Sequence, residues 1–173
     1  MRCAVFTLNV GNTRTTLAAW RAGRVAARLE WATGHKPPRR LAHVLAANAA
    51  GQAPVVLASV VPAYSTALRA VLRELGRKVL VFRKDLTPRI EIVPRPPQRV
   101  GDDRIASALG ALALDGTRPW VVVDAGTALT VNAVRPRSGT RAPRFEGGLI
   151  IPGAGLALRA LADGTAQLPF IGA

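Results

Sequence analysis

Two segments of the sequence share one run of residue types that could bind phosphate. Residues 8–13 (LNVGNT) align with residues 123–127 (VDAGT), and in each an apolar strand ends in Asn or Asp before a Gly and a Thr. Glycine permits a tight turn with outward-facing N–H groups that form an anion-binding concavity, and threonine adds a hydroxyl donor. The Asn or Asp oxygen could hold a metal on that phosphate. One such turn could be an ordinary hairpin, but two facing each other could clamp a polyphosphate.

A second candidate for chemistry is Gly101-Asp102-Asp103-Arg104, which precedes a predicted helix. A carboxylate beside an arginine could act as a general base on a hydroxyl, while the arginine binds an anionic substrate. The same residues also suit a helix N-terminus, where Asp caps free N–H groups and opposes the helix dipole. The residue types alone leave both interpretations open. Gly147-Gly148 and Pro152-Gly153 permit close backbone approach before another helix and are a weaker anion site.

The elements that must position these residues can be read from the apolar patterning. Short apolar runs bounded by turn residues predict strands at 2–9, 14–20, 24–31, 54–58, 78–82, 119–124, 129–134 and 144–151, with a further short one at 90–93. Helical spacing predicts helices at 41–50, 62–75, 103–114 and 152–162. Meandering strands followed by helix–strand alternation favour an α/β fold with mixed sheets and helices on their faces.

The repeated strand–turn–strand unit indicates an internal duplication. We therefore expect one domain at residues 1–115, with the first turn and the acidic motif, and a partial second domain at residues 116–173. The second domain has only about half of the elements of the first, so we expect it to be incomplete. An incomplete sheet exposes strand edges and apolar surface, which predicts dimerisation or aggregation.

Composition excludes several classes of protein. The chain has 173 residues, of which 49% are apolar, too many for a disordered chain. Its single cysteine, Cys3, cannot form an internal disulfide, which favours a reducing cytoplasmic location. Residues 2–8 are too short an apolar run for a signal peptide, and no 18-residue apolar stretch predicts a membrane span.

The charge is strongly basic: 24 Lys and Arg against 10 Asp and Glu give a formal net charge of +14. Such a balance suits a nucleic-acid surface or simply many solvated arginines. The densest cluster, Arg89, Arg95 and Arg99, lies in a proline-broken loop without interleaved aromatic residues for base stacking. We therefore expect no nucleic-acid partner, and the charge favours an anionic ligand such as a nucleotide.

Five segments together resemble the type III pantothenate kinase family, which belongs to the sugar-kinase, Hsp70 and actin superfamily of duplicated RNase H-like (actin-like ATPase) domains. They are LNVGNTRT at 8–15, ASVVP at 58–62, PPQRVGDDRIASALGAL at 96–112, VVVDAGTALTVNAV at 121–134 and FEGGLIIPGAGLALRALADGTAQLP at 145–169. The resemblance implies phosphorylation of pantothenate to 4′-phosphopantothenate, the first step of coenzyme A biosynthesis. It further implies ATP with Mg²⁺, a monovalent cation (K⁺ or NH₄⁺) and a cytoplasmic homodimer.

The resemblance also assigns roles to individual residues. In the motif of Gly101, Asp102, Asp103 and Arg104, which would bind pantothenate, Asp103 would be the catalytic proton acceptor. Asp124 would hold the monovalent cation. The residues expected to contact ATP are Asn9, Val10, Gly11, Asn12, Thr13, Arg14, Thr15, Thr16 and Thr127.

Three departures from the family pattern support an alternative function. Asn9 stands where the family usually has Asp, and Pro94 stands where a Tyr usually lines the substrate pocket. The family also continues well past its last matching segment, 145–169, which is followed in this sequence only by residues 170–173. The alternative is a non-catalytic or truncated homologue that acts as a binding or regulatory, accessory-factor-like protein.

Overall fold

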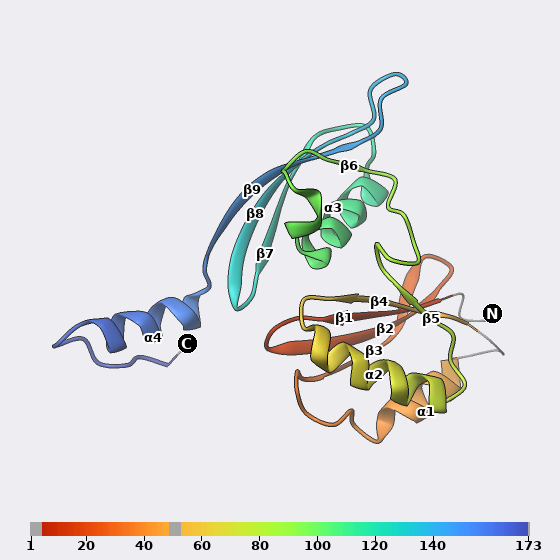
Figure 1. Cartoon of the computed structure of the whole chain (residues 1–173), viewed down its shortest axis with the longest axis horizontal. Coiled ribbons are helices and arrows are strands. Elements are labelled where there is room, and N and C mark those ends of the chain that lie inside the picture. The colour runs from red at the N-terminus through yellow and green to blue at the C-terminus, as the bar shows by residue number, and fades with distance from the viewer. Residues whose placement is uncertain (1–4, 49–52, 173) are drawn as a thin grey trace. The chain divides into compact units, whose positions relative to one another are not determined.

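The computed structural model describes residues 5–48 and 53–172 (Figure 1). Contacts divide the chain into two compact units. The first runs to Pro88 and includes Gly101–Asp103, and the second holds Arg89–Val100 and the chain from Arg104 onward. The repeat boundary predicted at residue 115 stays a prediction, because contact units reflect packing and a repeat boundary reflects internal sequence similarity.

The first unit is built on a mixed five-stranded sheet in the order β3-β2-β1-β4-β5. The first three strands form an antiparallel meander. Strand β4 pairs in parallel with the free edge of β1, and β5 pairs in parallel with β4. The strands are β1 (Val5–Val10), β2 (Arg14–Arg21), β3 (Arg24–Ala32), β4 (Val55–Ser59) and β5 (Val79–Val81).

Alternation along β1 sends Phe6, Leu8 and Val10 into the core, where each is at most 1% exposed. Two helices, α1 (Arg40–Asn48) and α2 (Pro62–Glu74), cover this face, and Leu41, Leu45, Leu68 and Leu72 pack against it (Figure 1). Pro62 occupies the first turn of α2, where its missing N–H costs nothing. Each buried Leu or Phe stabilises this core by about 1.5–3 kcal/mol.

The second unit holds a four-stranded sheet in the order β6-β9-β8-β7. Strands β7, β8 and β9 repeat the antiparallel meander of the first unit, and β6 pairs in parallel with β9. Its elements are β6 (Glu91–Ile92), the 3₁₀ helix η1 (Pro97–Arg99), β7 (Trp120–Ala125), β8 (Ala128–Arg135), β9 (Arg144–Pro152) and α4 (Ala154–Gly164). Helix α3 (Asp102–Leu114) starts with residues grouped in the first unit and continues in the second.

The two faces of the second sheet differ sharply in burial. On the face toward α3, Asn132, Val134 and Phe145 are at most 1% exposed. On the opposite face, Val123 of β7 and Leu149 of β9 are both paired with Val131, yet they are 57% and 66% exposed. Within the described residues, β7 pairs only with β8, so the parallel strands that cover the β1 edge in the first unit have no counterpart here.

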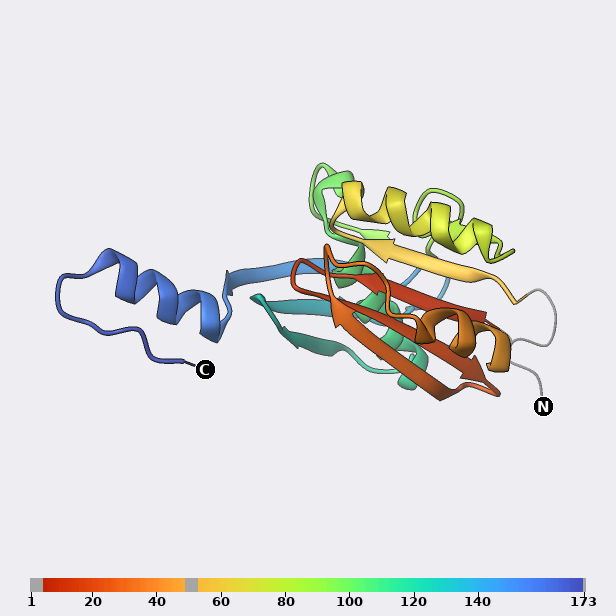
Figure 2. The same ribbon diagram turned by 90° about the horizontal axis from the view of Figure 1, so that it is seen from below.

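Helix α4 extends beyond the end of β9 in both views (Figures 1 and 2) and buries none of its residues. The architecture confirms the expected α/β fold with mixed, duplicated sheets and a second sheet less complete than the first. No helix in the described part of the chain is both long and apolar enough to cross a membrane.

Most predicted elements are present, with shifts that have physical reasons. The last helix begins at Ala154 instead of residue 152, because Pro152 still pairs with Ala128 in the sheet and Gly153 is extended. The predicted strand at 90–93 narrows to Glu91–Ile92. Residues 49–50 of the first predicted helix, residues 2–4 of the first predicted strand and Cys3 lie outside the described residues.

Candidate functional site

The first predicted phosphate turn connects β1 to β2. The N–H of Gly11 donates to the carbonyl oxygen of Arg14 at 3.0 Å and closes the hairpin, so this N–H is used within the turn. Thr33, just beyond β3, holds the turn from the side: its hydroxyl donates to the carbonyl of Gly11 at 2.8 Å, and its N–H donates to that of Thr13 at 2.9 Å. Thr33 was not singled out by the sequence pattern, because it lies far along the chain from the motif.

The residues of the first turn that are expected to contact ATP differ in burial, and Gly11 and Thr16 are half-buried. Asn9, Asn12, Thr13 and Arg14 are exposed, whereas Val10 and Thr15 are fully buried. The Thr15 hydroxyl lies 2.9 Å from that of Thr33, inside the protein. The side chains of Val10 and Thr15 therefore support the turn from the core side and do not reach a ligand outside it.

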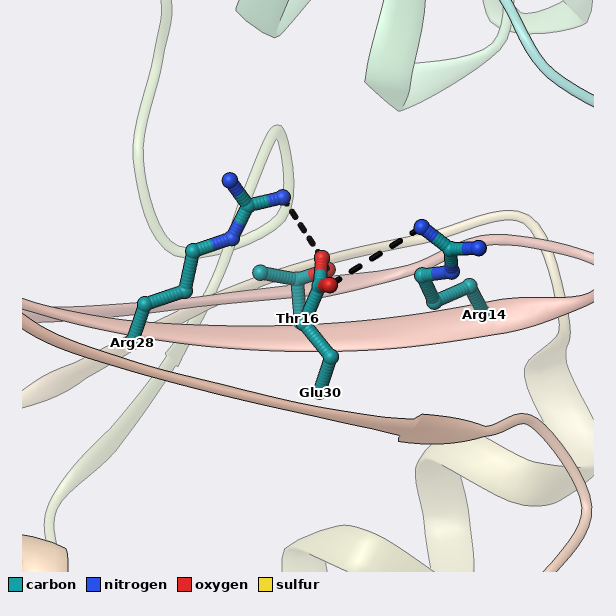
Figure 3. Close-up of polar contacts among 4 residues, drawn as sticks. All are labelled: Arg14, Thr16, Arg28 and Glu30. Carbon is teal, nitrogen blue, oxygen red and sulfur yellow. Dashed lines mark hydrogen bonds and ion pairs between the residues drawn. The ribbon is translucent and has the colours of Figure 1, made fainter.

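A charged network lies beside this turn on β2 and β3 (Figure 3). Glu30 accepts hydrogen bonds from Arg28 at 2.5 Å and Thr16 at 2.9 Å, and Arg14 lies 3.8 Å from its second oxygen. The hydrogen bond from Arg28, followed by that from Thr16, lowers the pKa of the Glu30 carboxyl. Two guanidinium groups share one carboxylate, so the network keeps a positive charge that favours an anion near the turn.

The second predicted phosphate turn connects β7 to β8 and is closed in a similar way. The Gly126 N–H donates to the Ala128 carbonyl at 3.1 Å, and the Gly153 N–H donates to the Thr127 carbonyl at 3.0 Å. A Cβ on Gly153 would lie 2.0 Å from the Gly126 carbonyl oxygen, so only glycine fits there. Asp124 and Thr127 are both exposed at this turn.

The first three residues of the acidic motif, Gly101–Asp103, lie next to the first turn within the first unit. Val60 connects them: its N–H donates to the Val10 carbonyl at 3.0 Å, and its side chain lies 3.7 Å from where a Cβ on Gly101 would be. That same Cβ would be only 2.5 Å from the Asp103 carboxylate. The absence of a side chain at Gly101 therefore makes room for the carboxylate of Asp103 in its observed position.

Asp102 is engaged by a residue that sequence analysis missed. Arg83, which follows β5, forms a 3.2 Å ion pair with the Asp102 carboxylate, and both side chains are less than a quarter exposed. Burial raises the pKa of Asp102, and the charge of Arg83 opposes this shift. The pair ties the start of α3 to the segment after β5, both of which belong to the first unit.

Arg104, the last residue of the motif, contacts two residues of the second unit. Its Nε donates to the Oδ1 of Asn132 at 2.7 Å, and its guanidinium lies 5.4 Å from the centroid of the Phe145 ring. Neither partner was predicted. The available signal was Asn132 itself, a polar residue in the middle of an otherwise apolar strand.

The donor atoms fit a cation that is bound mainly by phosphate. No group of three or more His, Cys, Asp or Glu side chains able to hold a metal occurs in the described ranges. Exposed oxygens are nevertheless present at the strand ends, on Asn9 and Asp124. Mg²⁺ commonly uses only one or two protein oxygens together with substrate phosphates and water, so the exposed oxygen at either turn, taken by itself, suits a Mg²⁺ ion that arrives with ATP.

Comparison with known proteins identifies the family. The family model described as type III pantothenate kinase matches residues 5–173. The type III pantothenate kinase of Thermosynechococcus vestitus is 34% identical over 169 residues, covering 96% of this chain and 56% of that protein. That of Kosmotoga olearia is 30% identical over 174 residues, covering 93% of this chain and 62% of that protein. The chain thus spans little more than half the length of these relatives.

A crystal structure of a candidate 2-dehydro-3-deoxygalactonokinase from Sinorhizobium meliloti superposes with a TM-score of 0.52 at 16% identity. The superposition covers 93% of this chain and 57% of that one, and it indicates that the two chains share a fold. The family match extends over nearly the whole sequence and includes both turns and the acidic motif. The chain belongs to the type III pantothenate kinase family.

Proposed function

We propose that the chain takes part in ATP-dependent phosphorylation of pantothenate to 4′-phosphopantothenate. The observation that carries this proposal is the position of Val60, whose N–H donates to Val10 at the end of β1 and whose side chain lies 3.7 Å from where a Cβ on Gly101 would be. The first turn and Gly101–Asp103, which we propose hold the nucleotide and the substrate, are thereby neighbours within the first unit.

The chemistry follows from the residue types. The Asp103 carboxylate accepts the proton of the primary hydroxyl of pantothenate, and that oxygen attacks the γ-phosphorus of ATP as ADP leaves. Arg104 binds the carboxylate of pantothenate through charge-assisted hydrogen bonds. The residues from Asn9 to Thr16 hold the phosphates, the buried Val10 and Thr15 by supporting the turn from the core side, and Thr127 is a further ATP contact. Mg²⁺ bound with ATP supplies charge neutralisation there.

The remaining assignments extend this proposal. Asp124, with its exposed carboxylate, holds the monovalent cation, K⁺ or NH₄⁺. The uncovered apolar face of the second sheet supports a homodimer. We further propose a metabolic role in the cytoplasm without a membrane partner. The arginine cluster of Arg89, Arg95 and Arg99 has no interleaved aromatic residue for base stacking, which supports a role without a nucleic-acid partner.

The test is phosphorylation of pantothenate by the purified chain with Mg²⁺-ATP and K⁺. We expect turnover that falls by about 10²–10⁴-fold in Asp103→Asn, because the general base is removed. Asp163→Asn, at an exposed position on α4, is the matched control and should retain activity. A wild-type chain that shows neither turnover nor calorimetric binding of ATP and pantothenate would instead support the non-catalytic, accessory-factor-like alternative.

A further inference from the structure

Asn132 is a fully buried polar residue in the middle of β8, on the face toward α3. A buried amide is costly unless its hydrogen bonds are made, and here both ends are engaged. Its Nδ2 donates to the Thr130 hydroxyl at 3.1 Å, and its Oδ1 accepts from Arg104 Nε at 2.7 Å. The bond to Thr130 defines which way the amide faces and so presents the oxygen to Arg104.

The Arg104 guanidinium is held by two different kinds of contact. The hydrogen bond to Asn132 lies along the Nε–H direction, and the ring of Phe145, itself fully buried, lies 5.4 Å from the guanidinium carbon. A hydrogen bond at one edge and an aromatic ring nearby together limit rotation of the side chain. Both partners lie on the sheet, which is more rigid than a loop and suits precise positioning.

Asn132 acts on Arg104 through an oxygen acceptor alone, and the guanidinium keeps its positive charge in this contact. A positively charged, oriented guanidinium is the geometry that recognises a carboxylate. We propose that Asn132 is a positioning residue that, with Phe145, orients Arg104 toward the carboxylate of the substrate. This inference rests on the proposed function, since the substrate carboxylate is that of pantothenate.

The variants separate positioning from simple packing. Asn132→Leu keeps the side-chain volume but removes the acceptor, and Asn132→Asp keeps an acceptor for Arg104. Val134→Ala, which creates a cavity at a buried neighbour on the same face of β8, is the control for general loosening.

Steady-state kinetics should show a specific effect on the acidic substrate. We expect Asn132→Leu to raise the KM for pantothenate by about 10- to 100-fold while the KM for ATP changes less than about twofold. Asn132→Asp should restore the KM for pantothenate to within a few-fold of wild type, and Val134→Ala should leave both KM values near wild type. The neutral methyl amide of pantothenate should be insensitive to Asn132→Leu. Equal sensitivity of the two substrates, or equal effects of the Leu and Ala variants, would overturn the inference.

A second readout keeps the inference separate from the proposed function. The Arg104 Nε–H resonance should be protected from exchange in wild type and Asn132→Asp and lose protection in Asn132→Leu. Protection that persists in Asn132→Leu would overturn the positioning role whatever the kinetics show. The wild-type protein could lack pantothenate turnover while the Arg104 resonance behaves as expected in all variants. That result would overturn the proposed function and the assigned substrate, and it would limit the inference to the statement that Asn132 orients Arg104.

Discussion

Leu8 and Val123 occupy equivalent positions in the two repeats, each one residue before the Asn or Asp of its turn motif, yet Leu8 is 1% exposed and Val123 is 57% exposed. The difference follows from what covers each sheet. Helices α1 and α2 cover the core face of the first sheet, whereas the equivalent face of the second is uncovered in the described residues. The same strand pattern therefore contributes very different amounts of stability.

Alanine substitutions at these two positions should show that difference. We expect Leu8→Ala to lower the free energy of unfolding by about 2–5 kcal/mol, because it leaves a cavity in a closed core. Val123→Ala should cost less than about 1 kcal/mol, because most of that side chain already contacts solvent. Urea denaturation of the purified chain measures both. Equal costs would mean that Val123 is buried in solution, and a concentration dependence of the Val123→Ala effect would assign that burial to a second copy.

Gly101 should be required for activity more than for folding. A Cβ at this position would lie 2.5 Å from the Asp103 carboxylate, so Gly101→Ala should displace that carboxylate by rotating a flexible side chain. We expect kcat for pantothenate to fall by about 10²-fold or more, as for loss of a positioned base, with little change in unfolding free energy. Gly110→Ala, within α3 and with no neighbouring atom within 4 Å of its Cβ, is the control and should retain activity with slightly higher stability. An active Gly101→Ala enzyme would contradict the role of Asp103.

The pH behaviour of Glu30 gives a test that needs no substrate. Hydrogen bonds from Arg28 and then Thr16 lower its pKa in the folded protein. Since the folded pKa lies below the unfolded one, Glu30 contributes stability above its unfolded pKa, and that contribution is lost as the pH falls through the folded pKa. We expect carboxyl NMR titration to place Glu30 below its ordinary value of 4.5 and Arg28→Gln to raise it. Arg24→Gln, at an exposed position on the same strand, should leave the Glu30 titration unchanged.

Sequence patterning predicted the helices and strands well. For the candidate site it indicated the residues within the motifs but not the residues, distant in sequence, that contact those motifs. Short apolar runs located the strands of both meanders, because each alternates or is apolar throughout between turn residues. The motif residues were also predicted, since turn chemistry is local. Thr33, Arg83 and Asn132 were missed because each acts on a motif distant in sequence, and only the fold brings them together. The burial of Thr15 has a different, local reason: strand alternation along β2 directs its side chain into the core.

Thr33 offers the sharpest test of this non-local support. Its hydroxyl donates to the Gly11 carbonyl, and Thr33→Val keeps the shape while removing that bond. A lost hydrogen bond of this kind costs about 0.5–1.5 kcal/mol, and the loss here falls on the turn that we propose binds ATP. We therefore expect the KM for ATP to rise several-fold while the KM for pantothenate stays near wild type. Thr66→Val, which removes a hydroxyl bonded within α2, is the matched control and should change neither KM. The bond that Thr33→Val removes is made to the backbone of the turn itself. A larger rise in the KM for pantothenate than in the KM for ATP would therefore mean that the nucleotide does not bind at this turn.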